Sequence, residues 1–117
     1  MHLVPADRAH RRIIEEEKVC QAIDSLEPDR IREWSERFAL LSDPTRLSLL
    51  LCIKAAEPIS VSDLAAAVDQ NSDTVSQTLR FLRANHTVTA HRDGRVIRYR
   101  LADPTIRQLL AFGATDG

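Results

Sequence analysis

The chain has 117 residues, of which 44% are hydrophobic and only 4% aromatic, and its formal net charge is −1. This length suits one domain with a core of Leu, Ile, Val and Ala, and the near-zero net charge argues against a nonspecific polycation. The most apolar stretch, 47–53, is far shorter than the ~20 residues that a membrane helix needs, and the N-terminus lacks a signal-peptide pattern. We therefore expect a cytoplasmic protein without a disulfide framework.

The charge is unevenly distributed along the chain. Residues 1–43 carry a net charge of −3 and residues 70–117 carry +3, and all seven basic residues of the last segment are Arg. Arg forms bidentate hydrogen bonds with phosphate and guanine more readily than Lys. The pattern fits a DNA-facing side and an acidic far side, although Arg that only solvates a surface would produce it too.

The first half of the chain predicts three helices. Residues 7–23 can form the first, with loosely spaced apolar side chains, and Pro28 can begin the second. The second has an apolar stripe at helical spacing, formed by Ile31, Trp34, Phe38 and Leu41. Asp43 is a good N-cap for a third helix, which begins at Pro44 and ends before Pro58.

Residues 60–101 contain the most informative pattern. A capped helix over 60–68 is followed by a polar break and by a second helix over 72–84, which buries one apolar side. Two strands then flank Asp93-Gly94, which fits a type I′ turn, and Ile97, Tyr99 and Leu101 are expected to point inward. This order predicts a mainly α fold, a winged helix-turn-helix with a small β-hairpin wing.

A last short helix over 104–112 completes the expected fold, and residues 113–117 are expected to be a flexible tail. We assign residues 28–112 to the winged helix-turn-helix domain. Residues 1–27 are expected to be a helical extension that takes part in a dimer interface.

Four motifs, in this order, resemble the ArsR/SmtB family of winged-helix repressors. Residues 38–47 (FALLSDPTRL) look like the family's "ALADPTRL" segment, and 61–65 (VSDLA) like its "V-x-D-L-A" segment. Residues 74–83 resemble "x-V-S-x-H-L-x-x-L-R", and 93–101 resemble the wing motif "x-G-R-x-x-x-Y-x-L". The resemblance covers residues 31–110 and implies a homodimer that binds double-stranded operator DNA and releases it when an inducer, usually a metal ion, binds.

The second helix of the helix-turn-helix would enter the major groove. Its polar side, opposite the apolar one, carries the candidate DNA-binding residues Ser72, Asp73, Ser76, Gln77 and Arg80. By resemblance the first four occupy base-contacting positions, whereas Thr78 stands where the family often has His. Arg92 and Arg95 at the wing tip are the candidate phosphate or minor-groove contacts.

By resemblance, the first and last helices form the dimer interface. The candidate interface residues are Ile13, Ile14, Trp34, Phe38, Leu109 and Leu110. Trp34 and Phe38 could instead belong to the core of a single subunit.

The resemblance also directs attention to metal sites. The family's thiolate site needs Cys-x-Cys where this chain has Ser60-Val61-Ser62, and hydroxyls are poor ligands for soft metals. A second family site needs Asp-x-His, but here Thr105 follows Asp103 in place of His.

The remaining candidate metal ligands are His10 and Cys20, which would suit nickel, zinc or cobalt as an inducer. A solvated His10 and a buried Cys20 with no metal remain an alternative interpretation.

The sequence thus predicts a sequence-specific DNA-binding repressor that a transition metal such as nickel or zinc releases from its operator. One alternative is a thiol-redox repressor that uses Cys20 and Cys52, and another is a winged-helix regulator with no small-molecule inducer. We do not expect an enzyme, because the chain has no glycine-rich phosphate loop and no nucleophile with a convincing base.

Overall fold

The computed structural model describes residues 4–8 and 11–112. The chain divides into two compact units, Met1–Glu36 and Arg37–Gly117, and the boundary lies inside helix α2 (Pro28–Leu41). The expected tail over 113–117 and the candidate ligand His10 lie outside the described residues.

In the N-terminal unit, helical structure is shorter than the sequence suggested. A single 3₁₀ turn (η1, Ala6–Arg8) precedes α1 (Glu16–Asp24), so the first half of the helix expected over 7–23 is absent from the described residues. Glu15, the N-cap residue, has an extended backbone, so α1 begins only at Glu16. The apolar spacing of this segment is also too irregular to bury one helical face.

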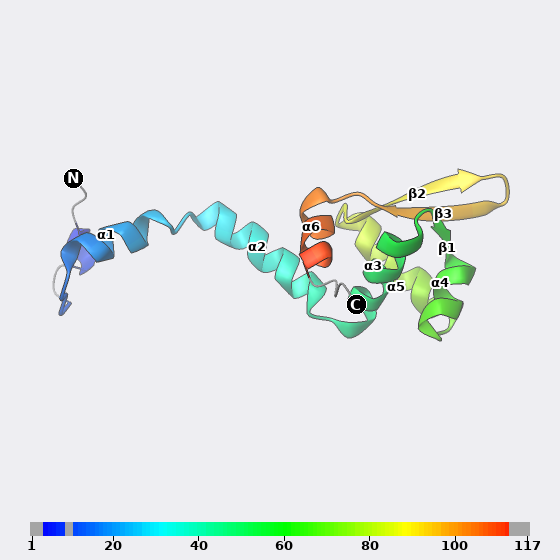
Figure 1. The fold of residues 1–117 in the computed structure, drawn as a ribbon, viewed down its shortest axis with the longest axis horizontal. Helices are drawn as coiled ribbons and strands as arrows, with labels where there is room; N and C mark the ends of the chain where they lie inside the picture. Colours follow the sequence, from blue (N-terminus) through cyan, green and yellow to red (C-terminus); the bar gives the residue numbers. More distant parts are fainter. Residues whose placement is uncertain (1–3, 9–10, 113–117) are drawn as a thin grey trace. The chain divides into compact units, whose positions relative to one another are not determined.

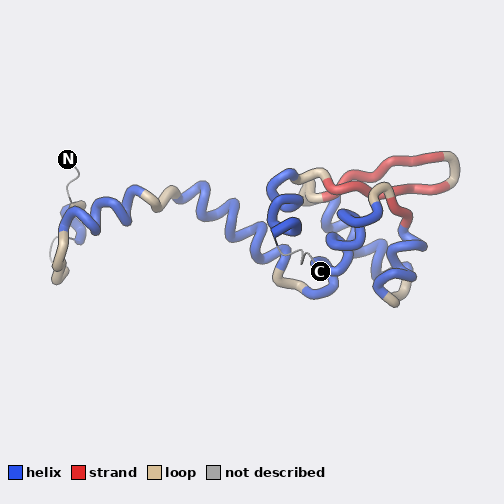
Figure 2. Tube along the Cα trace, viewed as in Figure 1, coloured by secondary structure: helices blue, strands red, loops and turns tan. Residues whose placement is uncertain are grey.

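The C-terminal unit is a winged helix-turn-helix, as the sequence predicted. After the end of α2 it contains α3 (Pro44–Ala56), β1 (Ile59–Ser60), α4 (Val61–Val68), α5 (Ser72–Ala84), β2 (Val88–Asp93), β3 (Val96–Leu101) and α6 (Pro104–Phe112) (Figure 1). Figure 2 shows that the strands form one small sheet beside the helices, so the unit is mainly α.

The sheet has one strand more than the sequence indicated. Its antiparallel order is β1-β3-β2, and Ile59 of β1 pairs with Tyr99 of β3. A strand of two residues is too short to show a period-2 pattern, which is why only the hairpin was predicted.

The hairpin turn differs by one residue from the expected turn. Gly94 and Arg95 form its two-residue loop, and of these two only Gly94 has a positive φ, of 64°. A type I′ turn requires positive φ at both loop residues, whereas a type II′ turn requires it only at the first. The turn is therefore of the II′ kind, and glycine occupies the one position that needs it.

Four helices of this unit begin at side-chain caps, the last of them Asp103 at the start of α6. Asp43 accepts a hydrogen bond from the Arg46 N–H at 2.9 Å, and Ser60 accepts one from the Asp63 N–H at 3.2 Å. Asn71, in the turn between α4 and α5, caps α5. Such caps satisfy backbone donors that otherwise have no partner at a helix start.

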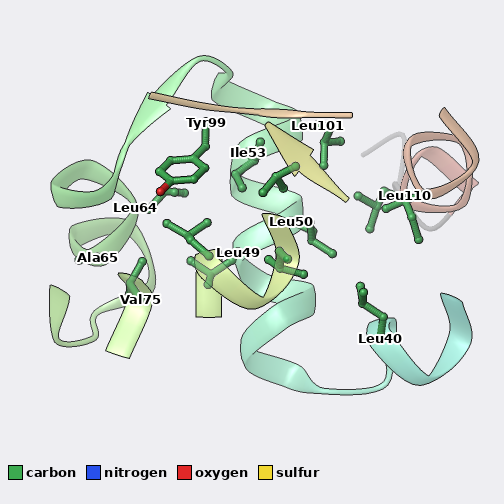
Figure 3. Packing of buried hydrophobic residues seen from close by; sticks show 14 residues of the cluster. Leu40, Leu49, Leu50, Ile53, Leu64, Ala65, Val75, Tyr99, Leu101 and Leu110 are labelled. Atoms are coloured by element: carbon green, nitrogen blue, oxygen red, sulfur yellow. The ribbon is translucent and has the colours of Figure 1, made fainter. Parts of the chain in front are cut away.

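The core of the unit is aliphatic and is centred on α3. Figure 3 shows Leu49, Leu50 and Ile53 of α3 surrounded by side chains from α4, α5 and the sheet. The largest fully buried side chains among the described residues are Leu49, Leu50, Ile53, Leu64, Leu79, Leu82, Ile106, Val75 and Val88. Burial of each such side chain contributes about 1.5–3 kcal/mol, so this cluster fixes the positions of α4 and α5.

Among the described residues, no helix is both long and apolar enough to cross a membrane.

A salt bridge joins α6 to the end of the wing and to the loop after α3. Arg107 donates to both carboxylate oxygens of Glu57, at 2.6 and 2.7 Å, and the Leu101 N–H donates to the same carboxylate at 3.2 Å. The hydrogen bonds from Arg107 lower the pKa of Glu57 below its ordinary value; partial burial opposes this shift, and the Leu101 N–H adds to it.

This geometry predicts a pH-dependent contribution to stability. The carboxylate pKa is lower in the folded state, so the stabilisation is complete above the unfolded pKa and is lost as the pH falls through the folded pKa. We expect Glu57→Gln to lower the free energy of unfolding at pH 7 by about 1 kcal/mol, because it removes a charge-assisted bidentate pair that is partly exposed on the Arg107 side.

Urea unfolding at several pH values measures this contribution. The difference between wild type and Glu57→Gln should shrink as the pH drops below about 4.5, the ordinary glutamate value. The same substitution at exposed Glu36 is the control. Parallel pH profiles for wild type and Glu57→Gln would contradict the assigned role.

Candidate nucleic-acid interface

The orientation of α5 follows from the side that it buries. Val75, Leu79 and Leu82 are completely buried and lie on one face of the helix. Residues near 180° from this face must point to solvent, since each residue advances the helix by 100°. Asp73 and Gln77 occupy that opposite face.

The predicted DNA-reading residues lie on this helix with unequal exposure. Ser72, Asp73, Gln77 and Arg80 are exposed, whereas Ser76 is only partly exposed. The structure therefore brings five of the sequence-predicted residues onto one surface helix. Gln77 is the best placed of them to bond a base edge, because its amide offers both a donor and an acceptor.

A short turn sets the angle between α4 and α5. Asp69 adopts a left-handed conformation with a φ of 55°, and its N–H donates to the carbonyl of Ala66 at 3.3 Å. The Gln70 N–H donates to Ala65 at 3.0 Å, which completes a Schellman-type C-cap. Asn71 then caps α5 by accepting from the Asp73 N–H at 2.7 Å. Because both helix ends are satisfied within three residues, the turn has little conformational freedom.

The wing presents the two predicted arginines at its tip. The β2–β3 hairpin extends beyond the helices of this unit (Figure 1), and Arg92 and Arg95 are exposed on it. Arg98 donates a hydrogen bond to Asp93, so its charge is partly neutralised. The hairpin also explains a wrong prediction: Ile97 remains 38% exposed, because it lies beyond the core that covers Tyr99 and Leu101.

Arg46 on α3 and Phe81 on α5 form a contact that was not predicted from the sequence. The Arg46 guanidinium donates to the carbonyls of Leu40 and Ala39 at 3.0 and 3.2 Å and lies 4.9 Å from the centroid of the Phe81 ring. Arg46 is part of the DPTR motif, but the spacing of apolar residues in the sequence does not indicate which groups it contacts.

The predicted interface residues differ in exposure. In the N-terminal unit, Ile14 is 92% exposed, and Ile13 and Trp34 are partly buried. In the C-terminal unit, Phe38 is 56% exposed and Leu109 is partly buried.

Leu110, by contrast, is only 4% exposed, and it packs in the core of its own unit. It therefore supports α6 from inside rather than standing on its surface. Phe112, which was not among the predicted interface residues, is 93% exposed on the same helix.

Comparison with known proteins identifies the family. A family model described as a helix-turn-helix domain matches residues 41–87. The HTH-type transcriptional repressor SmtB of Mycobacterium tuberculosis (strain CDC 1551) is 31% identical over 103 residues, which cover 87% of this chain and 70% of that protein. The chain belongs to the ArsR/SmtB family of transcriptional repressors.

Two further members of the ArsR/SmtB family match over a smaller part of their own length. The transcriptional repressor SmtB homolog of Synechocystis is 38% identical over 69% of this chain and 61% of that protein. The regulator KmtR of M. tuberculosis is 38% identical over 74% of this chain and 66% of that protein. The chain thus spans somewhat less than two thirds of the length of these two relatives.

Solved structures agree with the fold. The antimony-specific transcriptional repressor AntR is 27% identical with a TM-score of 0.66, and the match covers 97% of this chain and 91% of AntR. The transcriptional repressor BigR of Xylella fastidiosa is 27% identical with a TM-score of 0.67, over 75% of this chain and 93% of BigR.

The residues at the two ArsR/SmtB metal positions do not fit a metal. Ser60 uses its hydroxyl oxygen to cap α4. The Asp103 carboxylate accepts from the backbone N–H groups of Thr105 and Ile106 at 2.9 and 3.3 Å and from Arg37 at 3.3 Å. A metal at either position would have to displace a helix cap, and neither position retains the family's thiolates or imidazole.

Elsewhere among residues 4–8 and 11–112, no group of three His, Cys, Asp or Glu side chains is arranged to hold a metal ion. Cys20 is 4% exposed in α1, Cys52 is partly buried in α3, and both are free thiols.

Proposed function

We propose that this member of the ArsR/SmtB family is a sequence-specific repressor that binds operator DNA through α5 and the wing. The observation that carries the proposal is the division of α5 into a fully buried apolar face and an exposed polar face that includes Gln77. The wing adds Arg92 and Arg95 for the sugar-phosphate backbone. The transcriptional repressors among its relatives support the same function.

We further propose that the active form is a homodimer. The helix that would read the bases, α5, is the recognition helix of each subunit, and one such helix contacts too few bases for specific binding. The proposed interface includes Phe38 and Leu109, with Ile13, Ile14 and Trp34 of the N-terminal unit. A two-fold dimer would read two half-sites about one helical turn apart.

Selection of duplexes from a random pool tests both proposals. We expect enrichment of an inverted repeat with half-sites about 10 base pairs apart, and sedimentation should show a dimer. Enrichment of no sequence, or a monomer at micromolar concentration, would overturn the proposed function.

Gln77→Ala should weaken binding to the selected duplex by about 1–3 kcal/mol and relax discrimination at one base pair, because the variant cannot form a bidentate hydrogen bond with a base edge. Fluorescence anisotropy with single-base variants of the duplex measures both effects. Gln108→Ala, an exposed position on α6, is the matched control. Unchanged base preference in Gln77→Ala would remove this residue from the interface.

Arg95→Ala should weaken binding to all sequences alike, because it removes a phosphate contact that carries no sequence information. The slope of log affinity against log salt concentration should become shallower by about 0.9 for each phosphate that Arg95 neutralises in the wild-type complex. Arg30→Ala, which removes the same charge from α2, is the control. A slope equal to that of wild type would place Arg95 in solvent.

The inducer is a separate proposal, and we propose a transition metal ion such as nickel, zinc or cobalt. Similarity to a repressor described as antimony-specific supports an inorganic ion as the inducer. The choice of nickel, zinc or cobalt rests on the ligand types, because one thiolate and one imidazole suit these borderline metals. Because the two family positions are occupied by caps, the ligands would come from the N-terminal unit, with Cys20 and His10 as the candidates.

Titration of the DNA complex with each metal tests the inducer. One metal should release the DNA, and Cys20→Ser or His10→Ala should abolish this release while Cys52→Ser does not. Release by peroxide that requires both Cys20 and Cys52 would instead identify a thiol switch. DNA affinity that no metal changes would contradict the metal proposal and leave the DNA-binding proposal intact.

A further inference from the structure

Arg46 connects the end of α2 to α5, the helix that we propose enters the major groove. It lies in the first turn of α3 and is partly buried. Its guanidinium binds the carbonyls of Ala39 and Leu40 in the last turn of α2, and it also lies over the ring of Phe81 on α5. One planar cation thus contacts the end of α2 and the C-terminal half of α5 at the same time.

Both contacts are favourable for an arginine in particular. The last carbonyls of a helix lack intrahelical partners and carry partial negative charge, so a cation there is stabilising. The face of an aromatic ring also attracts a cation. Lysine could supply the charge but not the planar fork that reaches two carbonyls while stacking on a ring.

Phe81 is placed where it can set the position of Gln77. The two residues are four apart on α5 and therefore neighbour each other on the helix surface. Phe81 is 45% exposed, so the core does not hold its ring in place. Its contact with Arg46 therefore restrains the position of the side of α5 that carries Gln77.

The surroundings of Arg46 argue against a direct phosphate contact. Arg46 and Phe81 line an open hollow of about 250 Å³ together with Asp43, Gln77 and Thr78. Asp43 is one of the residues that line this hollow, and its negative charge would repel a phosphate there. Two of the guanidinium donors of Arg46, on Nε and Nη2, are already directed at the α2 carbonyls.

We propose that Arg46 is a positioning residue for DNA recognition: it fastens α5, through Phe81, to the C-terminal turn of α2, and so fixes the angle at which Gln77 meets a base edge. The proposal deepens the function proposed above and rests on it. If Arg46 acts in this way, a movement of the last turn of α2 would also move α5.

The test compares Arg46→Met, Phe81→Leu and Phe81→Tyr with wild type on the selected duplex and on a scrambled duplex, well below each melting temperature. Arg46→Met keeps an apolar stem but removes the charge and the donors. Phe81→Tyr keeps the ring, whereas Phe81→Leu removes it. Lys54→Met, which removes a positive charge from the same helix, is the matched control.

We expect Arg46→Met and Phe81→Leu each to lower the ratio of specific to nonspecific affinity about fivefold, the equivalent of one cation–ring contact. The double variant should show little further decrease beyond either single variant, because both remove the same contact. The salt slope should stay at the wild-type value, and Phe81→Tyr and Lys54→Met should keep the wild-type ratio.

Three results would overturn the inference. A salt slope shallower by about 0.9 in Arg46→Met would make Arg46 a phosphate contact instead. Lower melting temperatures with an unchanged affinity ratio would leave it a purely structural residue. Effects that add fully in the double variant would show that Arg46 and Phe81 act separately.

Failure of wild type to select any duplex would refute the proposed function rather than this inference.

Discussion

Burial of one side of α5 is the constraint on which the rest of the structure depends. Val75, Leu79 and Leu82 are fully covered by the core around α3, so the helix cannot rotate about its axis without exposing them. The opposite side is thereby held toward solvent with its polar groups in fixed directions. The Schellman turn at Asp69 and the Asn71 cap add the second constraint, on the angle between α4 and α5.

Much of this architecture could be predicted from the sequence, because it is encoded locally. The caps at Asp43, Ser60 and Asn71, the 3.6-residue spacing in α5 and the presence of a tight hairpin turn at Gly94 are all readable over a few residues, although the type of that turn was predicted wrongly. The errors arose where tertiary contacts decide. Strand β1 exists because Ile59 meets Tyr99, forty residues later, and Ile97 is exposed because the hairpin extends beyond the core.

The candidate site was partly readable for the same reason. Gln77 and its neighbours follow from which side of α5 is apolar, and Arg92 and Arg95 follow from the hairpin turn. Arg46 could not be found in this way. Its partners are two backbone carbonyls and a ring thirty-five residues away, and a backbone carbonyl leaves no trace in the identity of the residue that carries it. Whether Leu109 or Leu110 is exposed on α6 was equally undecidable from spacing alone.

The capping role of Ser60 has an evolutionary consequence. A lineage acquiring cysteine at this position would exchange a strong hydroxyl acceptor for a weak sulfur acceptor, at a cost of about 1 kcal/mol to α4. A protein that evolved a thiolate site for a soft metal here would therefore first pass through a variant with a less stable fold. Compensating substitutions, or a metal bound tightly enough to restore that stability, would be the routes by which such a sensor could arise from this scaffold.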